Sequence, residues 1–497
     1  MSSYQSSEKK MNNSIVIGKF TLESLTNGMY ASCLDLYREY VQNAADSLDE
    51  AIELGLIGEQ ESLIRISIDT RLKRIQIEDN GVGIHASEAG STLLDIGNSK
   101  KIKKSNRGFR GIGRLAGLGY CEKLVFSTSF KGENLCTIVE YDAKMLKSLL
   151  HSSNDKNESM YDVLSAVITK KTLKEKESTH YFKVEMLGVD EKSVLLNEKK
   201  VKDYLLQNLP LDFDMTFNWG KIIKSKMAYE GYKIPNYNII VDYDETQLKL
   251  MKEYRDTFIS DRVKKYEKHV EDIEIVPFRK DDKLIALLWY AKTDYSGTIL
   301  DDLIKGIRIR QGNILIGDKF TSNQYFKEER FNGWLLGELY IIDDGFIPNA
   351  RRDDFEDNEI YEYLKSLLNE WSTRISRKIR SISYERNTSD EKKQILNETQ
   401  DIEENSLEFE DVLFIGEDDE INDFIDESEA VANNELFDKF RLLIGSKTGN
   451  SKYKALNMCT SVTVEQKQML ERVFDILYKV YSTKKAETIT NDIVSNL

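Results

Sequence analysis

The sequence predicts an α/β protein with more than one domain. The chain has 497 residues, more than a typical single domain, and a hydrophobic share of 40% is enough to form real cores. A charged share of 31% with only four prolines is typical of a folded, soluble protein rather than a disordered one. Apolar residues recur with helical spacing in some segments and alternate in others, which predicts both helices and strands.

The overall chemistry argues against several classes of function. A net charge of -15 disfavours a broad nucleic-acid footprint, although a local basic patch is compatible with it. The four cysteines and four histidines lack metal-ligand spacing, which argues against a zinc site and a Ser-His-Asp hydrolase. We find no apolar signal segment and no run of about 18 apolar residues, so we expect a cytoplasmic protein with no membrane partner.

Residues 34–52 predict an amphipathic helix that carries a second, polar line. Its apolar positions recur at three- and four-residue steps. Glu39, Asn43 and Asp46 follow the same spacing on another line, so their side chains stack above one another. Asn43 offers an oxygen ligand of the kind that Mg²⁺ prefers, and Glu39 can polarise a water molecule for attack on a phosphate. The alternative is a solvated helix face.

Two glycine-containing segments follow this helix. A predicted hairpin over residues 63–68 and 74–78 leads into DNGVG, where Asp79 can accept a hydrogen bond from an adenine amine. The glycines allow a flat ligand to approach the backbone. Further along, GFRGIGRLAG precedes a predicted helix and exposes N–H groups that attract phosphates. Each segment taken alone is more often an ordinary turn, and GxxxxGK[ST] is absent from the chain.

The order of these segments resembles the GHKL ATPase superfamily, which includes gyrase B, heat-shock chaperones, histidine kinases and MutL. REYVQNAADSLD resembles its first motif, IEDNGVGI the adenine motif, and GFRGIG the glycine-rich motif at the edge of the lid. IGNSKKIKKS resembles the lid segment that closes over ATP. The opening helix is closest to the ninety-kilodalton heat-shock chaperones, whereas GFRGIGRLAG is similar to MutL and microrchidia proteins.

The resemblance implies a role for each residue that matches a motif. Glu39 would be the general base, Asn43 the magnesium-binding amide, and Asp79 the acceptor for the adenine amine. Gly83 would line the base pocket, and Thr179 would match the threonine beside the adenine aspartate. The other matches would lie near the phosphates, in the lid or as backbone donors: Asn98, Lys100, Gly108, Gly111 and Gly113. The implied ligands are ATP and Mg²⁺.

A second α/β domain is predicted to follow. NYNIIVDY, IALLWYAK, GIRIRQGNILIG and WLLGELYIID predict strands, and QLKLMKEYRDTFISDRVKKYEKHV predicts a charged helix. Three basic residues of the GIRIRQGN region are predicted to form a solvated strand face: Lys305, Arg308 and Arg310.

The loop GFIPNARRDDFE resembles the catalytic loop of the chaperone middle domain. The resemblance implies that Arg352, or its neighbour Arg351, reaches the γ-phosphate and neutralises its charge. The alternative is that both arginines pair at the surface with nearby carboxylates, namely Asp353, Asp354 and Glu356.

The predicted architecture has four parts. The resemblance implies a Bergerat-type ATP-binding sandwich of helices on a mixed sheet over residues 1–215. It also implies a ribosomal-protein-like α/β transducer domain over residues 216–384. Residues 385–432 are strongly acidic and predict a flexible linker, and residues 433–497 predict a short helical C-terminal tail.

Together these features predict an ATP-hydrolysing clamp of the heat-shock-chaperone type that couples lid closure and domain docking to protein remodelling. Two chains would join through the C-terminal helices and through ATP-dependent contact of the N-terminal domains. The alternative is a DNA-associated ATPase of MutL or microrchidia type, supported by the basic run SKKIKKSNRGFR. A nucleotide-binding module without turnover also stays open. A histidine kinase is disfavoured, because no helix with a phosphoacceptor histidine precedes the ATP motifs.

Overall fold

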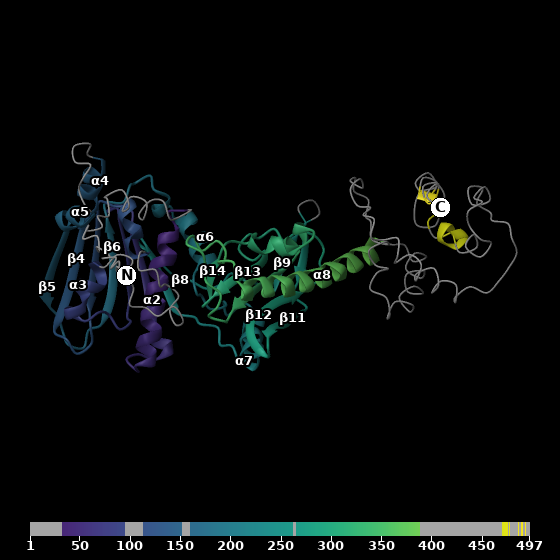
Figure 1. Ribbon diagram of the computed structural model, residues 1–497, viewed down its shortest axis with the longest axis horizontal. Helices are drawn as coiled ribbons and strands as arrows, with labels where there is room; N and C mark the ends of the chain where they lie inside the picture. Colours follow the sequence, from purple (N-terminus) through teal and green to yellow (C-terminus); the bar gives the residue numbers. More distant parts are fainter. Residues whose placement is uncertain are drawn as a thin grey trace, which may run out of the picture. The chain divides into compact units, whose positions relative to one another are not determined.

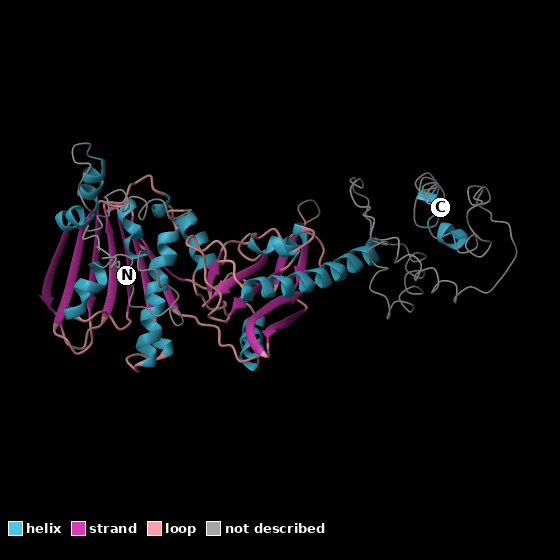
Figure 2. Ribbon diagram, in the orientation of Figure 1, coloured by secondary structure: helices cyan, strands magenta, loops and turns pink. Residues whose placement is uncertain are grey.

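The computed structural model describes residues 32–94, 113–151, 160–261 and 265–387, and short helical pieces between residues 470 and 493. The chain forms two compact units, residues 1–383 and 384–497. Sheets of the first unit are magenta in Figure 2. In the second unit, Leu470 and Phe474 form a small buried contact. None of the helices described is long and apolar enough to cross a membrane.

An eight-stranded sheet forms the first half of the first unit (Figure 1). Its spatial order is β5-β4-β3-β6-β2-β1-β7-β8, and neighbours are antiparallel except for β1 and β7, which run parallel. The strands are β1 (Leu63–Asp69), β2 (Arg74–Asp79), β3 (Lys123–Ser129), β4 (Leu135–Asp142), β5 (Ile168–Lys174), β6 (Tyr181–Leu187), β7 (Asn238–Tyr243) and β8 (Thr246–Lys249). The predicted hairpin is confirmed as β1 and β2.

Helices cover one face of this sheet. Alternation along β1 buries Ile64, Ile66 and Ile68 on the covered face, where they pack in one core with the helices. The longest helix there is α2 (Asp35–Glu53), and it ends where Gly55 adopts a left-handed φ of +65°. The others are α3 (Ala86–Leu94), α4 (Ala143–His151), α5 (Met160–Val167) and α6 (Glu198–Asn208), with short 3-10 helices η1 (Glu59–Glu61), η2 (Gly113–Gly119) and η3 (Val194–Leu196).

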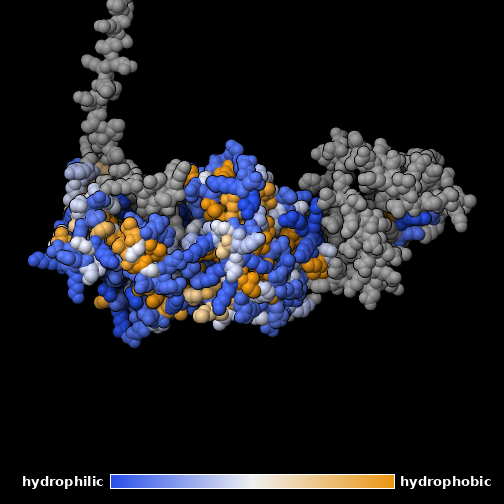
Figure 3. All heavy atoms as spheres, turned by 90° about the horizontal axis from the view of Figure 1, so that it is seen from below, coloured by the Kyte–Doolittle hydropathy of each residue, from blue (hydrophilic) through white to orange (hydrophobic). Residues whose placement is uncertain are grey.

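A five-stranded sheet forms the second half, in the order β11-β12-β15-β13-β14. Two further strands, β9 (Thr257–Ser260) and β10 (Tyr266–His269), form a separate two-stranded sheet and directly precede β11 in the sequence. Helix α8 (Glu359–Asn387) packs an apolar stripe that includes Leu364, Leu368 and Trp371 into a core that it shares with strands of this five-stranded sheet. The remaining elements are α7 (Trp219–Tyr229), β11 (Asp272–Lys280), β12 (Lys283–Lys292), β13 (Gly306–Gln311), β14 (Ile314–Ile316), η4 (Thr321–Tyr325), η5 (Glu329–Trp334) and β15 (Leu336–Ile341). The face in Figure 3 is mostly hydrophilic, with separate hydrophobic patches.

The chain passes between the two halves three times. After α6, residues 209–218 lead to α7, whose buried residues join the core of the second half. The chain then returns, and β7 and β8 complete the first sheet. It leaves again between Leu250, in the first core, and Tyr254, in the second. Strand NYNIIVDY therefore belongs to the first sheet, although the sequence pattern assigned it to the second domain.

The predicted charged helix over residues 247–270 is wrong. This stretch contains β8, β9 and β10 instead. In β9, Phe258 and Ser260 are buried while their neighbours are exposed, which is the period of a strand rather than of a helix. β9 and β10 pair antiparallel, and Asp261 and Lys265, next to their adjoining ends, both have positive φ.

The predicted solvated face of β13 is also wrong for two of its three residues. Arg308 and Arg310 are only 1% and 2% exposed. Both faces of β13 are covered, and Glu338 on the neighbouring strand β15 supplies a carboxylate to Arg310. A sequence pattern that alternates arginine with isoleucine does not reveal such a distant partner.

Candidate functional site

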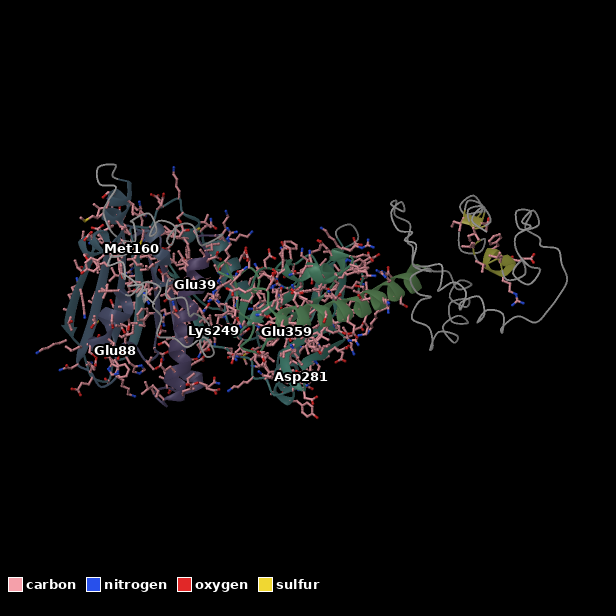
Figure 4. All side chains as sticks on the ribbon, in the orientation of Figure 1. Glu39, Glu88, Met160, Lys249, Asp281 and Glu359 are labelled. Atoms are coloured by element: carbon pink, nitrogen blue, oxygen red, sulfur yellow. The ribbon has the colours of Figure 1, made fainter. Side chains whose placement is uncertain are left out.

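One end of the candidate site is built around the carboxylate of Glu39 on α2 (Figure 4). The Nε atom of Arg352 lies 3.3 Å from Glu39 Oε1, and both side chains are 13% exposed. A Cβ atom at Gly113 would lie 2.4 Å from Glu39 Oε2, so a larger residue at this position would require the end of the Glu39 side chain to move. The first motif, the end of the glycine-rich motif and the second-domain arginine loop therefore meet at one carboxylate.

The arginine loop is a tight turn that directs one of its two arginines to Glu39. A β-bridge between Pro348 and Phe355 closes the loop, and Arg352 adopts a left-handed φ of +57°. The backbone carbonyl of Arg352 accepts a hydrogen bond from the N–H of Gly317 at 2.8 Å. Arg351 is exposed. Arg352 thus pairs with Glu39, a carboxylate that is distant from it in sequence.

Arg38 connects α2 to this loop. Its side chain is buried, and Nη2 donates to the carbonyl of Arg351 at 3.3 Å. Carboxylate oxygens of Asp35 and Glu39 lie 3.7 and 3.8 Å from the guanidinium. Tyr204 on α6 donates to Asp35 at 2.9 Å. The sequence alone does not decide whether Arg38 orients Glu39 or lies exposed, and the structure buries it beside Glu39.

Tyr40 fixes the glycine-rich segment on α2, and sequence reasoning missed it. Its hydroxyl accepts from the N–H of Gly117 at 2.9 Å and donates to the carbonyl of Arg114 at 3.1 Å. These bonds place η2, a seven-residue 3-10 helix, directly beside Glu39. The only sequence signal was a tyrosine on the apolar face next to a candidate base.

The other end of the site is built around Asp79, the last residue of β2. Asp79 is 3% exposed, and its Oδ1 accepts from the N–H of Gly81 at 2.9 Å. Gly83 has φ +70°, and a Cβ there would lie 2.0 Å from the carbonyl oxygen of Ser129. Only glycine fits at this position. The result is a buried carboxylate beside a close-packed backbone, which suits a flat base with an exocyclic amine.

Thr179 and His180, which directly precede β6, complete the end of the site around Asp79. Thr179 lies in the turn before β6, not in the strand, and its carbonyl accepts from Ser129 Oγ at 3.3 Å. His180 Nδ1 lies 2.7 Å from the carbonyl of Gly81. Because a carbonyl oxygen only accepts, Nδ1 carries the proton. His180 therefore connects β6 to the DNGVG turn, a contact that no local sequence signal indicated.

Helix α2 joins the two ends. A Cβ at Gly81 would lie 2.1 Å from Ser47 Oγ, and the N–H of Val82 lies 3.4 Å from the Ser47 carbonyl. Glu39 and Ser47 are eight residues apart, which corresponds to about 12 Å along a helix. The candidate adenine-binding residues therefore lie near one part of α2 and the candidate phosphate-binding residues near another, about two turns away.

Asn43 lies between these ends, one turn after Glu39, and is partly buried. Among the residues described, no group of three or more His, Cys, Asp and Glu side chains could hold a metal ion. An amide oxygen plus phosphate oxygens and water suits Mg²⁺, which seldom uses an all-protein cage. Four predicted site residues lie outside the described residues: Asn98, Lys100, Gly108 and Gly111.

Residues 22–177 match the family model "Histidine kinase-, DNA gyrase B-, and HSP90-like ATPase". The match supports a GHKL-type ATPase domain and ATP binding, and the large mixed sheet with helices fits the fold of that domain. A similar protein is "Putative type II restriction enzyme HgiDII" of Herpetosiphon aurantiacus, 33% identical over 106 residues. The aligned region covers 20% of this chain and 15% of the relative's length.

Proposed function

We propose that this protein is an ATP-hydrolysing clamp of the heat-shock-chaperone-like GHKL type. The observation that carries the proposal is the meeting of Glu39 with Gly113 and Arg352, each from a different part of the first unit. A carboxylate is a suitable general base for water, and a guanidinium is a suitable partner for a charged phosphate. Neither group alone would distinguish an ATPase from a solvated surface.

In the proposed mechanism, Asp79 accepts the adenine amine and Gly83 lets the base approach the backbone. Glu39 removes a proton from the attacking water molecule, and Arg352 neutralises charge on the terminal phosphate. Asn43 would hold Mg²⁺, which neutralises phosphate charge when it is bound. The pairing of Glu39 with Arg352 places the guanidinium beside the proposed general base.

In this proposal, residues 216–384 act as the transducer domain and deliver Arg352. Closure of the lid and docking of the arginine loop would make the ATP-bound shape differ from the free shape. Two chains would join through their C-terminal helices, with ATP-dependent contact of the N-terminal domains. The clamp would act on a client protein.

The test is steady-state ATP hydrolysis together with ATP binding, measured on the wild type and three variants. Glu39→Ala is expected to bind ATP and to lose turnover by about 10²- to 10⁴-fold, the usual contribution of a general base. Arg352→Ala is expected to lose turnover by about 10³-fold or more. Arg351→Ala is the matched control, because its side chain is exposed, and should retain turnover.

Each result bears on a separate claim. Unchanged turnover in Glu39→Ala would remove the general base from the mechanism. Equal loss in both arginine variants would argue for a general charge effect rather than a specific contact of Arg352. If the wild type binds ATP but neither hydrolyses it nor is changed by these substitutions, the nucleotide-binding module without turnover is the better description.

A DNA-associated ATPase is the second candidate. The similarity to a protein named as a type II restriction enzyme favours it, because that class acts on DNA. Binding to duplex DNA would then depend strongly on salt: affinity would fall as the salt concentration rises, because the counterions that binding releases from the DNA gain less entropy. Salt-dependent DNA binding that ATP strengthens would favour this candidate over the chaperone type, whereas its absence would favour a protein client.

A further inference from the structure

The second half of the first unit contains a group of charges far from solvent. Lys252, Arg310 and Glu338 are each 2% exposed or less. Arg310 pairs with Glu338, and Lys252 Nζ lies 2.6 Å from Glu338 Oε2. The hydroxyl of Tyr340 also donates to Glu338 at 2.6 Å. We call these four residues the buried charge cluster.

The buried charge cluster lies where the three passages between the halves meet. Arg310 Nη2 donates at 3.0 Å to the carbonyl of Gln207, in the last turn of α6, where the first passage begins. Lys252 is itself on the third passage, and its N–H donates to the carbonyl of Asp212 at 2.8 Å. The first contact comes from the Arg310 side chain and the second from the Lys252 backbone, so residues of the cluster hold both the end of α6 and the connection that follows it.

Asn313, in the turn between β13 and β14, connects the second passage, between α7 and β7, to the buried charge cluster. Its amide Nδ2 donates to the carbonyls of Leu211 at 3.1 Å and Pro235 at 2.6 Å. Its Oδ1 accepts from Lys252 Nζ at 2.9 Å. A single amide thus joins an outgoing passage, a returning passage and the buried charge cluster.

The same β-hairpin contacts the arginine loop. The N–H of Gly317, directly after β14, donates to the carbonyl of Arg352 at 2.8 Å. Gln311 Nε2, at the end of β13, donates to the carbonyl of Phe346 at 3.0 Å. The β13–β14 hairpin therefore contacts both the passages between the halves and the arginine loop.

Buried ion pairs seldom stabilise a fold more than apolar residues of the same size would, because desolvation of the charges offsets their attraction. Such groups can instead specify one geometry. We propose that the buried charge cluster positions Arg352, by fixing the β13–β14 hairpin to the passages between the halves. This inference rests on the proposed function for the role of Arg352, but the contact it describes can be tested without turnover.

Arg310→Met is the test variant and Arg308→Met the matched control. Both arginines are on β13 and both are buried, but Arg308 donates to the carbonyls of Lys305 and Asp302, within its own turn. Arg310→Met should increase amide exchange at Gly317, whose N–H bonds to Arg352, and Arg308→Met should leave it unchanged. Exchange is measured on the full chain without nucleotide.

Turnover supplies a second readout. Arg310→Met should keep the ATP dissociation constant and lower kcat by about 100-fold, as a misplacement of about 1 Å can do. The double variant Arg310→Met/Arg352→Ala should lose no more turnover than Arg352→Ala alone, because both changes remove the same contact. A folded Arg310→Met with protected Gly317 and normal kcat would overturn the proposal.

Asn313→Gly is the second variant, for the case in which Arg310→Met does not fold. Asn313 has φ +63°, which glycine adopts freely, and the change leaves all charges in place. It should expose Gly317 to exchange in the same way, and unchanged exchange would count against the proposal. If the wild type lacks ATPase activity, the proposed function fails, while the Gly317 readout still decides whether the hairpin positions Arg352.

Discussion

At the scale of single residues, sequence motifs select candidate site residues but not the contacts that surround them. Glu39 and Asp79 stand out as candidates because the motifs place an acid at a fixed distance from glycine or asparagine. Arg38, Tyr40 and His180 were missed or left open because their partners are distant in sequence. The Arg38 guanidinium, for example, donates to a carbonyl 313 residues away. No local pattern encodes such a contact.

Gly83 gives a prediction at this scale. Gly83→Ala should destabilise the fold and abolish ATP binding, because the new methyl group would lie 2.0 Å from the Ser129 carbonyl. Gly55→Ala is the matched control: its φ of +65° is close to the +70° of Gly83, but nothing lies within 4 Å of a Cβ there. We expect a loss of about 1 kcal/mol in the control from the backbone alone, measured by urea unfolding.

Comparing the two variants separates the free-energy cost of the steric clash at Gly83 from the cost of placing alanine at a positive φ. A larger loss for Gly83→Ala than for Gly55→Ala supports close packing at the base end. Equal losses with intact ATP binding would contradict it.

At the scale of elements, amphipathic spacing identified α2 and the β1–β2 hairpin, whereas charge misled the prediction elsewhere. The stretch over residues 247–270 has many charged side chains and was predicted as helix, but pairing of consecutive strands, β7 with β8 and β9 with β10, overrides its local preference. The arginines of β13 were predicted to form a solvated face because the partner of Arg310, Glu338, lies on β15, distant in sequence. Buried charges are the feature that a sequence pattern describes least well.

The buried charge cluster also predicts a dependence of stability on pH. Burial alone would raise the pKa of Glu338, but the charges of Arg310 and Lys252 outweigh it and lower the pKa to about 2 from 4.5. A carboxyl group with a lowered pKa in the folded state stabilises the fold above pH 4.5, and this contribution is lost as pH falls toward 2. The urea midpoint should therefore fall between pH 4.5 and pH 2.5.

Variants separate Glu338 from the other acidic residues. Glu338→Gln should show a smaller fall in the urea midpoint over the same interval, whatever its stability at neutral pH. Glu370→Gln on α8 is the control, because that side chain is exposed, and it should follow the wild type. Identical slopes for all three proteins would exclude Glu338 as a source of the acid dependence.

At the scale of the whole molecule, the predicted boundary after residue 215 does not coincide with the division between the sheets. β7 pairs with β1 over six residues, yet it follows α7, which packs in the other core. Sequence composition alone does not show that a strand returns to an earlier sheet. The resemblance to a known family led to the expected boundary, because the ATP motifs end well before β7.

A fragment of residues 1–215 should therefore be less stable than residues 1–387. Without β7 and β8, the edge of β1 is unpaired and open to aggregation. We expect residues 1–387 to unfold cooperatively and residues 1–215 to aggregate or to melt at a lower temperature, as measured by circular dichroism and light scattering. A soluble fragment 1–215 with the same melting temperature and ATP affinity would contradict this expectation.

The interlaced path of the chain also limits how such a protein can evolve. A recombination event with one breakpoint between residues 213 and 250 would join a sheet that lacks strands to a core that lacks a helix. The ATP-binding half and the half that carries Arg352 are therefore expected to be inherited together. New specificity would arise more readily by exchange of the segment after α8 than by exchange of either half.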